Sequence, residues 1–556
     1  MKNLLGQLFF RSRYPLAVGA GLMLAAAFPS LSIAGLAWVA PALLLASAFG
    51  KTGRDAWRIG YVGGLAHYLA SLYWLLLIPV AGYPILAWLA LSGYCAIYPA
   101  IWVWLLAGKV GEGSWSRRTA WSLAGAAIWV ALEMVVSRLF SGFPWNLLGT
   151  SQYRILPLIQ ITSFVGVHGV SFLVIWVSLS LFSAARIVLS QPAKRMAWQS
   201  EILLPLAMLV AVFVFGFSKL REPVKDGPTL RVTLIQPSIP QTMIWKESES
   251  TNRFNQLVAL TSQALTNETD LLLWPEAAVP KMIRYDETTF RAITGLASSN
   301  HVWMIMGSDD AEPPRNGSTN AADADYFNSS FLVGPEGKLV NVYHKRNLVI
   351  FGEYIPLVRW LPFIKWFTPI TGGFTAGEKV VPFELERWGE RPREPEGPQL
   401  SGSSGASPHQ PIRTATLICF EDVFAQLVPE YVDDDTDFLI NLTNDGWFGE
   451  GAEQWQHAAA GVFRAVENNV PLARCCNNGL TCWIDSRGRL QQVFHDQSGS
   501  VYGAGVMTAQ IPVLAPGEKR EPTFYNRHGD WFGWGCVMIT TVVILDRLRH
   551  MFQRKP

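Results

Sequence analysis

The sequence has few charged residues and few cysteines for a chain of its length. Only 16% of its 556 residues are charged, and the net charge of +2 forms no basic stripe with interleaved aromatic residues. A nucleic-acid-binding protein is therefore not predicted. The six cysteines show neither a metal-like spacing with histidine nor the pattern of a disulfide scaffold, so no structural metal, cofactor or obligatory disulfide is expected. A pairing among Cys475, Cys476 and Cys482 is left open.

Apolar residues, by contrast, make up half of the chain and are distributed unevenly. Residues 1–220 are mostly apolar, and residues 228–520 have the mixed composition of a soluble α/β chain. A last apolar run at 530–546 precedes a basic tail at 547–556. Because the chain is too long for a single core, these shifts predict separate domains. A segment rich in proline, glycine and serine at 387–411 is predicted to be a mobile loop.

The apolar runs predict a multi-pass helical membrane domain with about eight spans. A helix needs about 20 apolar residues to cross a bilayer. Seven such runs lie in residues 1–220, and the eighth is the run at 530–546. A signal peptide is an alternative interpretation of the first run, but the spans that follow favour an uncleaved helix. The predicted spans are 15–30, 34–50, 58–79, 82–108, 119–138, 161–185, 201–218 and 530–546.

Lysine and arginine residues alternate between successive loops. They cluster before the first span and after the second, fourth, sixth and last, whereas the loops after the first and third spans carry none. Cytoplasmic loops are the ones enriched in these residues. The pattern predicts cytoplasmic termini and places residues 228–520 on the outer side, which in a bacterial inner membrane is the periplasm.

Glu133 is an acidic residue within the fifth predicted span, where a charge is costly and often functional. We expect it to pair within the bundle, with Arg138 about one turn further on as its partner. His67 and His168 are interpreted as helix-packing residues.

Strand-like and helix-like stretches alternate in residues 228–520, which predicts two sheet layers flanked by helices. Hairpins are expected at 325–345 and from residue 479 onwards. A helix is expected between the strands that contain "ATLIC" and "TDFLI".

Three reactive side chains follow apolar strand-like runs. Glu276 follows "LLLWP", Lys345 follows "NVYH" and Cys419 follows "ATLI". Each has an ordinary interpretation, as a helix N-terminal acid, a solvated turn lysine and a buried core thiol. Strand ends often meet at one edge of a sheet, where sites form. Together the three predict nucleophilic catalysis, in which Glu276 takes the thiol proton, Cys419 attacks a carbonyl carbon and Lys345 stabilises the oxyanion.

Longer motifs around these residues carry a family resemblance. The stretches "LLLWPEAAVP", "YHKRNLVIFGEYIP" and "LICFEDVF" resemble the Glu, Lys and Cys motifs of the carbon–nitrogen hydrolase (nitrilase) superfamily. With the predicted spans and with "GFPWNLLGTSQ", "LIQPSIPQTMIW", "NLTNDGWFG" and "NNGLT", the chain resembles the apolipoprotein N-acyltransferase family over nearly its full length. The resemblance implies an α/β nitrilase-like αββα sandwich as the catalytic domain.

The resemblance also implies a reaction. Cys419 would take an acyl chain from a phospholipid, with phosphatidylethanolamine as the expected donor, and form a thioester. The α-amino group of a diacylglyceryl apolipoprotein would then accept that chain. Supporting roles are implied for Glu353, Glu421, Trp245 and Phe420. The family often has tyrosine directly after the cysteine, so a phenol hydroxyl at position 420 cannot be essential here.

An aromatic segment follows the lysine motif. In "RWLPFIKWFTPITGGF", aromatic and basic residues are mixed as at a membrane interface. We expect an arm that enters the outer leaflet and admits acyl chains, and the alternative is a loop packed on the soluble domain. The arm residues are Trp360, Phe363, Trp366 and Phe367.

Two other functions are compatible with parts of the sequence. A membrane-tethered hydrolase would use the same three residues with water as acceptor. A transporter whose outer domain only binds would not need Cys419, but the spans carry few of the ionisable groups that ion-coupled transport uses. The chain is expected to be a monomer.

Overall fold

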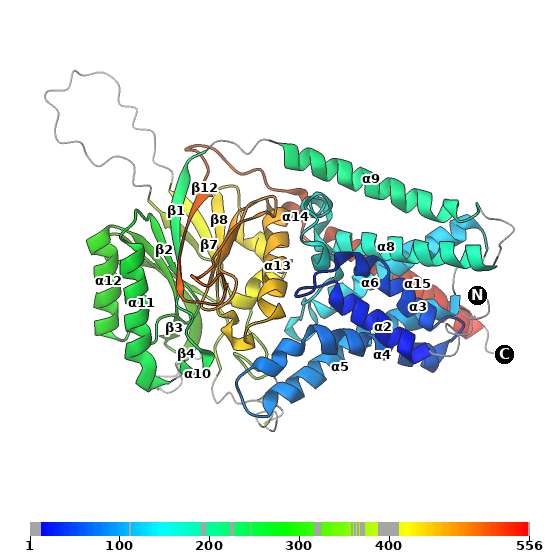
Figure 1. Cartoon of the computed structure of the whole chain (residues 1–556), viewed down its shortest axis with the longest axis horizontal. Helices are drawn as coiled ribbons and strands as arrows, with labels where there is room; N and C mark the ends of the chain where they lie inside the picture. Colours follow the sequence, from blue (N-terminus) through cyan, green and yellow to red (C-terminus); the bar gives the residue numbers. More distant parts are fainter. Residues whose placement is uncertain are drawn as a thin grey trace, which may run out of the picture.

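The structure is a computed structural model in which a helical bundle and a two-sheet sandwich lie end to end (Figure 1). Trp245, Phe367 and residues 387–410 of the predicted loop lie outside the described residues. The description covers residues 13–109, 113–190, 196–222, 227–244, 246–315, 324–356, 358, 360, 363, 366, 373–386 and 411–553.

Within these residues, a helix lies at each position where a span is predicted. Five of them, α5, α6, α8, α9 and α15, are long and apolar enough to cross a membrane. The described part of α2 has 14 residues and α3 has only 8, while α4 begins with charged residues. A multi-pass bundle is therefore supported, and the count of about eight stays a prediction. The helices are α2 (Arg13–Ala26), α3 (Ala40–Ser47), α4 (Gly53–Ser71), α5 (Tyr83–Leu106), α6 (Trp115–Val136), α8 (Thr162–Ser190), α9 (Gln199–Arg221) and α15 (Trp531–Gln553).

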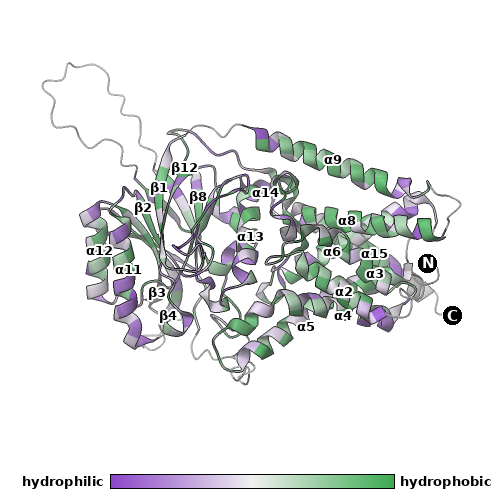
Figure 2. Ribbon diagram, viewed as in Figure 1, coloured by the Kyte–Doolittle hydropathy of each residue, from purple (hydrophilic) through white to green (hydrophobic). Residues whose placement is uncertain are grey.

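Small residues let the bundle helices approach closely. At Gly21 of α2, an added Cβ would lie 2.1 Å from the carbonyl oxygen of Gly63 on α4. Such contacts between small residues are typical of helices packed in a membrane. Apolar residues dominate the bundle helices (Figure 2). Short helices connect them: η1 (Ala34–Trp38), η2 (Tyr73–Leu77), η3 (Ala107–Lys109), η4 (Leu139–Ser141), η5 (Leu148–Gln152) and α7 (Leu156–Ile159).

The soluble half contains two six-stranded sheets within the described residues. In each sheet three neighbouring strands are parallel, β1 to β3 in the first and β7 to β9 in the second. The first sheet has the order β12 (Gly505–Pro512), β1 (Thr229–Gln236), β2 (Leu271–Trp274), β3 (Trp303–Glu312), β4 (Asp325–Val333), β5 (Leu339–His344). The second has the order β11 (Leu490–Val493), β10 (Cys482–Ile484), β9 (Leu472–Cys476), β8 (Thr436–Thr443), β7 (Ile412–Ile418), β6 (Pro382–Leu385).

Helices cover the outer faces of both sheets (Figure 1). On the first sheet lie α11 (Ser250–Ala264) and α12 (Glu287–Asn300), and α12 starts where the Asp286 side chain accepts a hydrogen bond from Thr289 N. On the second lies α13 (Ala452–Asn468), which also contacts α8 of the bundle. The predicted αββα layering is confirmed. The remaining short helices are α10 (Gln241–Ile244), η6 (Glu247–Glu249), η9 (Cys419–Val423), η10 (Val428–Tyr431), η11 (Asp445–Phe448) and α14 (Phe524–His528).

Several local predictions can be compared with this fold. Both hairpins are present, β4 with β5 and β10 with β11. The prediction of a helix between "ATLIC" and "TDFLI" was wrong, because that segment contains only two short 3-10 helices, η9 and η10. The six cysteines are all described and all free, so the pairing left open among three of them does not form.

Glu133 pairs within the bundle as expected, but its partner was predicted wrongly. It accepts hydrogen bonds from Trp129 Nε1 and Leu148 N, and His168 Nδ1 lies 3.4 Å away. Arg138 instead pairs with Asp530. The buried Glu133 carboxylate is therefore satisfied mainly by the Trp129 indole and the Leu148 backbone amide, not by a basic side chain.

Candidate active site

Glu276, Lys345 and Cys419 lie just beyond the ends of β2, β5 and β7. The first two strands belong to one sheet, and β7 belongs to the other. The three residues therefore meet across the sandwich, and the expectation that they share one sheet edge was wrong. Packing of the two sheets face to face brings the strand ends together.

Lys345 is held by two carboxylates. Its Nζ lies 2.8 Å from Glu353 Oε1 and 3.4 Å from Glu276 Oε1. The Asn328 side chain on β4 donates a 2.8 Å hydrogen bond to each of these carboxylates. Glu353 also accepts a hydrogen bond from Val349 N, so the loop after β5 closes around the ammonium group. The lysine, at 1% exposure, cannot leave this position without unpairing buried charges.

The charges of this group affect the protonation of Lys345 and Cys419. Burial by itself lowers the pKa of Lys345, but Glu353 and Glu276 outweigh it and raise that pKa, so the side chain is an ammonium ion. Burial raises the pKa of the Cys419 thiol, and the Glu276 carboxylate raises it further, against the opposing effect of Lys345. The resting sulfur is consequently a neutral thiol that interacts with both an acceptor carboxylate and a cation.

Cys419 lies at a sharp turn from β7 into η9, with a φ of 50°. A non-glycine residue in this left-handed region is uncommon and occurs often at functional sites. Its carbonyl oxygen accepts a 2.9 Å hydrogen bond from the Asn441 side chain on β8. The hydrogen bond from Asn441 therefore fixes the backbone of this turn.

Glu421, predicted as a supporting residue, is fully buried and joins two loops. It accepts hydrogen bonds from Ile418 N, from Arg346 N and Asn347 N, and from the Tyr343 hydroxyl. Burial raises the pKa of its carboxyl group, and these hydrogen bonds oppose that rise. Glu421 thus ties the turn of Cys419 to the segment that follows Lys345.

Phe420 packs against the membrane half. Its ring is stacked at 5.9 Å on Trp145, and the rings of Phe143 and Phe424 lie 6.2 and 4.9 Å away. A phenol hydroxyl would enter an apolar cluster at this position. The loop between α6 and α8 therefore reaches the residue next to the nucleophile candidate.

Three residues of the predicted arm are described, and all three are exposed. Trp360 and Trp366 are 83% and 78% exposed, and Phe363 is 48% exposed. The alternative of a loop packed on the soluble domain predicts burial of such large apolar side chains, which these three do not show. Phe367 and Trp245, the other two predicted aromatic residues of the site region, lie outside the described residues.

Two features of the site were missed at the sequence level. One is Asn328, which the strand pattern "DYFNSSF" gives no reason to select. The other is a buried group behind Cys419, formed by Asp422, Asp445, His457 and Arg474. The stretch "AEQWQH" could have indicated this group. A helix with polar residues on every face must bury some of them when it packs against a sheet.

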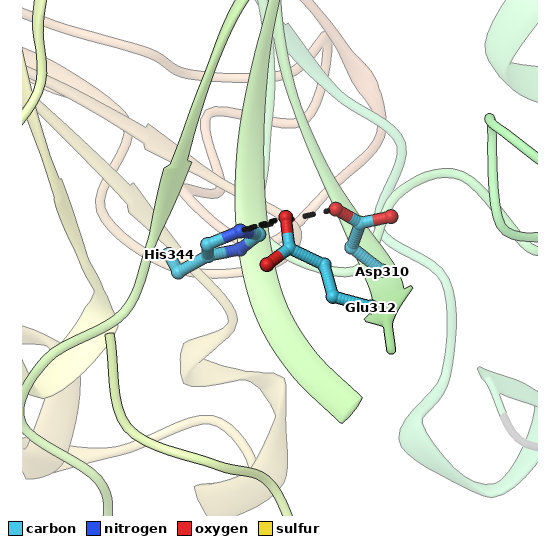
Figure 3. A group of neighbouring side chains, drawn as sticks. All are labelled: Asp310, Glu312 and His344. Carbon is cyan, nitrogen blue, oxygen red and sulfur yellow. Dashed lines mark hydrogen bonds and ion pairs between the residues drawn. The ribbon is translucent and has the colours of Figure 1, made fainter. Parts of the chain in front are cut away.

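Asp310, Glu312 and His344 form a group of possible metal ligands on β3 and β5 (Figure 3). His344 Nε2 lies 3.2 Å from Glu312 Oε1 and 4.0 Å from Asp310 Oδ2. Arg284 Nη1 lies 3.4 Å from a carboxylate oxygen of each acid. Ion pairing with Arg284 therefore accounts for this cluster.

Comparison with known proteins agrees with the two halves of the structure. The family model of the apolipoprotein N-acyltransferase N-terminal domain matches residues 20–180, and that of carbon-nitrogen hydrolase matches residues 231–513. The apolipoprotein N-acyltransferase of Geobacter metallireducens is 34% identical over 541 residues, which are 96% of this chain and 95% of that protein. The chain belongs to the apolipoprotein N-acyltransferase family.

Other relatives and a solved structure are also similar. The apolipoprotein N-acyltransferase of Vibrio vulnificus is 30% identical over 549 residues, covering 96% of each chain. An amidase of the nitrilase superfamily from Nesterenkonia AN1 is 15% identical, with a TM-score of 0.34 over 52% of this chain and 93% of that one. Membership of the family accounts for the union of a membrane-type bundle with a nitrilase-like sandwich in one chain.

Proposed function

We propose that this chain is a phospholipid:apolipoprotein N-acyltransferase. In the proposed reaction an acyl chain passes from a phospholipid to Cys419 and then to the α-amino group of a diacylglyceryl cysteine at a lipoprotein N-terminus. Family membership supports lipoprotein N-acylation, and the site supports a two-step route through a thioester. The observation that carries the route is that Glu276 and Lys345, whose charged groups lie 3.4 Å apart, both act electrostatically on the Cys419 thiol.

The first half-reaction begins from the neutral thiol. Glu276 accepts the thiol proton as sulfur attacks the sn-1 ester carbonyl of the donor, for which phosphatidylethanolamine is the expected headgroup. Lys345 and backbone N–H groups after Cys419 stabilise the oxyanion. When the carbon–oxygen ester bond breaks, Glu276 returns the proton to the leaving glycerol oxygen. The products are lysophospholipid and acyl-Cys419.

The second half-reaction uses the same groups. The lipoprotein α-amine attacks the thioester carbonyl, and Glu276 accepts a proton from the amine nitrogen. Collapse of the intermediate breaks the carbon–sulfur bond and leaves an amide, and the thiolate regains its proton. Glu353 accepts a hydrogen bond from Lys345, and Asn328 donates to both Glu276 and Glu353, so this network keeps Lys345 and Glu276 in place through both steps.

The location of the site follows from that of its substrates. Both are anchored in a bilayer, so we propose a bacterial inner-membrane enzyme with cytoplasmic termini and a periplasmic catalytic domain. The charge pattern of the loops supports this orientation. We also propose that the enzyme acts as a monomer, because the three reactive side chains all come from one chain.

Acyl labelling tests the route. Purified protein is incubated with phospholipid labelled in the acyl chain, quenched in acid and mapped. We expect a hydroxylamine-sensitive label on Cys419 that transfers to a diacylated lipopeptide when the lipopeptide is added. Release as free fatty acid at the same rate with and without lipopeptide would indicate the tethered hydrolase. Full function in Cys419→Ala would support the transporter and overturn the proposal.

The exposed aromatic residues give a second prediction, on the arm. Replacing both Trp360 and Trp366 by serine should slow acylation by phospholipid vesicles while leaving acylation by a soluble thioester unchanged. The reason is that indole rings contribute to binding at a membrane interface but have no part in the chemistry. Initial rates with the two donors provide the measurement. Tyr285→Ser, which removes another exposed aromatic side chain, is the control, and equal loss with both donors would contradict a membrane-binding arm.

A further inference from the structure

A buried cluster of four charged residues lies behind Cys419 and has no part in the proposed reaction. His457 on α13 is placed between two carboxylates: Nε2 is 2.7 Å from Asp422 Oδ1 and Nδ1 is 2.9 Å from Asp445 Oδ1. Arg474 on β9 bridges the same two acids, at 2.6 Å from Asp422 Oδ2 and 3.2 Å from Asp445 Oδ2. None of the four is more than 1% exposed. We call these residues the His457 cluster.

The His457 cluster contacts the backbone of Cys419 and acts electrostatically on its thiol. On the backbone side, His457 Nε2 lies 3.3 Å from the Cys419 carbonyl oxygen, which Asn441 also binds. On the side-chain side, the Thr443 hydroxyl donates a 2.8 Å hydrogen bond to Asp445, and both residues influence the pKa of the Cys419 thiol. The residue in the left-handed turn is therefore held at its carbonyl group, and the cluster acts on its thiol through the charge of Asp445.

The protonation of His457 follows from its neighbours. A neutral imidazole has one donor nitrogen, but here both nitrogens face carboxylate acceptors, so both must carry protons. Burial alone lowers the pKa of His457, yet Asp422 and Asp445 raise it to about 10. Glu453 also faces the ring at 3.8 Å, and burial raises its carboxyl pKa so that it is neutral. Two carboxylates, one imidazolium and one guanidinium then leave the cluster without net charge.

We propose that His457 is a positioning residue, whose imidazolium fixes the Cys419 turn and balances the negative charge that Asp445 directs toward the thiol. The proposal depends on the proposed function only in taking Cys419 as the nucleophile. The groups that act on the Cys419 thiol are Glu276 just after β2, Lys345 just after β5, Thr443 at the end of β8 and Asp445 at the start of η11. His457 is the cation that contacts the Cys419 backbone from the side of the second sheet.

The pH profile of Cys419 alkylation tests this role. In His457→Gln the cluster gains one net negative charge, which disfavours the thiolate. The midpoint for reaction with iodoacetamide should move to higher pH by about one unit or more, and alkylation at pH 7 should slow about tenfold. The full-length protein in detergent is used, and the Cys419 peptide is quantified by mass spectrometry. Acyl transfer should lose kcat with little change in KM.

A second variant gives a result of opposite sign. Asp445→Asn removes one negative charge but keeps an oxygen that can accept from Thr443, so its midpoint should move to lower pH. In the double variant His457→Gln/Asp445→Asn, the midpoint should return toward the wild-type value. Loss of folding cannot move the alkylation midpoint in opposite directions in the two single variants. The variants therefore distinguish a positioning role from structural damage, even if one of them is unstable.

The control removes a different buried histidine. His67 lies in the helical bundle, is 3% exposed and has no hydrogen bond to the His457 cluster. The alkylation profile of His67→Gln should therefore match that of the wild type. A wild-type profile in His457→Gln would overturn the positioning role while leaving the acyl-transfer proposal intact. Retained acyl transfer in Cys419→Ala would instead overturn the proposed function itself.

Discussion

Glu276→Gln is expected to slow acyl transfer by about 10²- to 10⁴-fold, the range that a general base contributes. The amide keeps an oxygen that can accept from Asn328 but cannot accept the thiol proton. The resting sulfur is a neutral thiol, because burial and the Glu276 charge raise its pKa, so no thiolate is supplied in advance. The measurement is the initial rate of transfer from phospholipid to a diacylated lipopeptide.

The same substitution should have a smaller effect on reactions that need only a thiolate. Loss of the Glu276 charge removes one cause of the raised Cys419 pKa, so alkylation of the thiol should move to lower pH while transfer falls. Glu287→Gln is the matched control, since Glu287 is an exposed acid on α12 that pairs with Arg291. A transfer rate within a few-fold of the wild type would mean that Glu276 is not the base.

Lys345→Met should reduce both activity and stability. Transfer is expected to fall by about 10²- to 10³-fold, as when one oxyanion donor is removed. The free energy of unfolding should fall by about 3–5 kcal/mol, because Glu276 and Glu353 lose the cation between them and stay buried. Transfer rates and thermal unfolding in detergent provide the two measurements.

The pH dependence identifies the cause of that instability. Protonation of an unpaired buried carboxylate removes the cost of its charge, so the stability deficit of Lys345→Met should shrink as the pH is lowered from neutral. Lys345→Arg, which keeps a cation, should lose activity but little stability. Lys338→Met, at an exposed position of the β4–β5 hairpin, is the control. A deficit that is independent of pH would point to lost packing rather than lost charge.

The parts of the site that could be predicted are those that depend on a few neighbouring residues in the sequence. Glu276, Lys345 and Cys419 each end an apolar strand, and strand periodicity together with the following polar residue is visible in a few letters. The hairpin turn after Val333 is equally local. Family motifs added the supporting residues Glu353 and Glu421, whose contacts in the structure explain why acids are needed there.

Non-local pairing could not be predicted. β1 lies between β2 and β12, and Thr229 of β1 pairs with Pro512 of β12, which is 283 residues further along the chain. The assignment of β5 and β7 to different sheets depends on such pairings, and so does the partner of Arg138. Arg138 is close to Glu133 in sequence but pairs with Asp530, a residue nearly 400 positions away.

The position of α13 has a consequence for attempts to study the sandwich alone. Gln456, next to His457, accepts hydrogen bonds from Trp74 and Trp145 and donates to the carbonyl oxygens of Pro29 and Ser71. The helix that backs the reactive thiol is thus anchored in the transmembrane bundle by its adjacent side chain. A water-soluble fragment cut out at residue 228 would strip this anchor and expose Gln456 to solvent. The bundle therefore also supports the helix that lies behind Cys419.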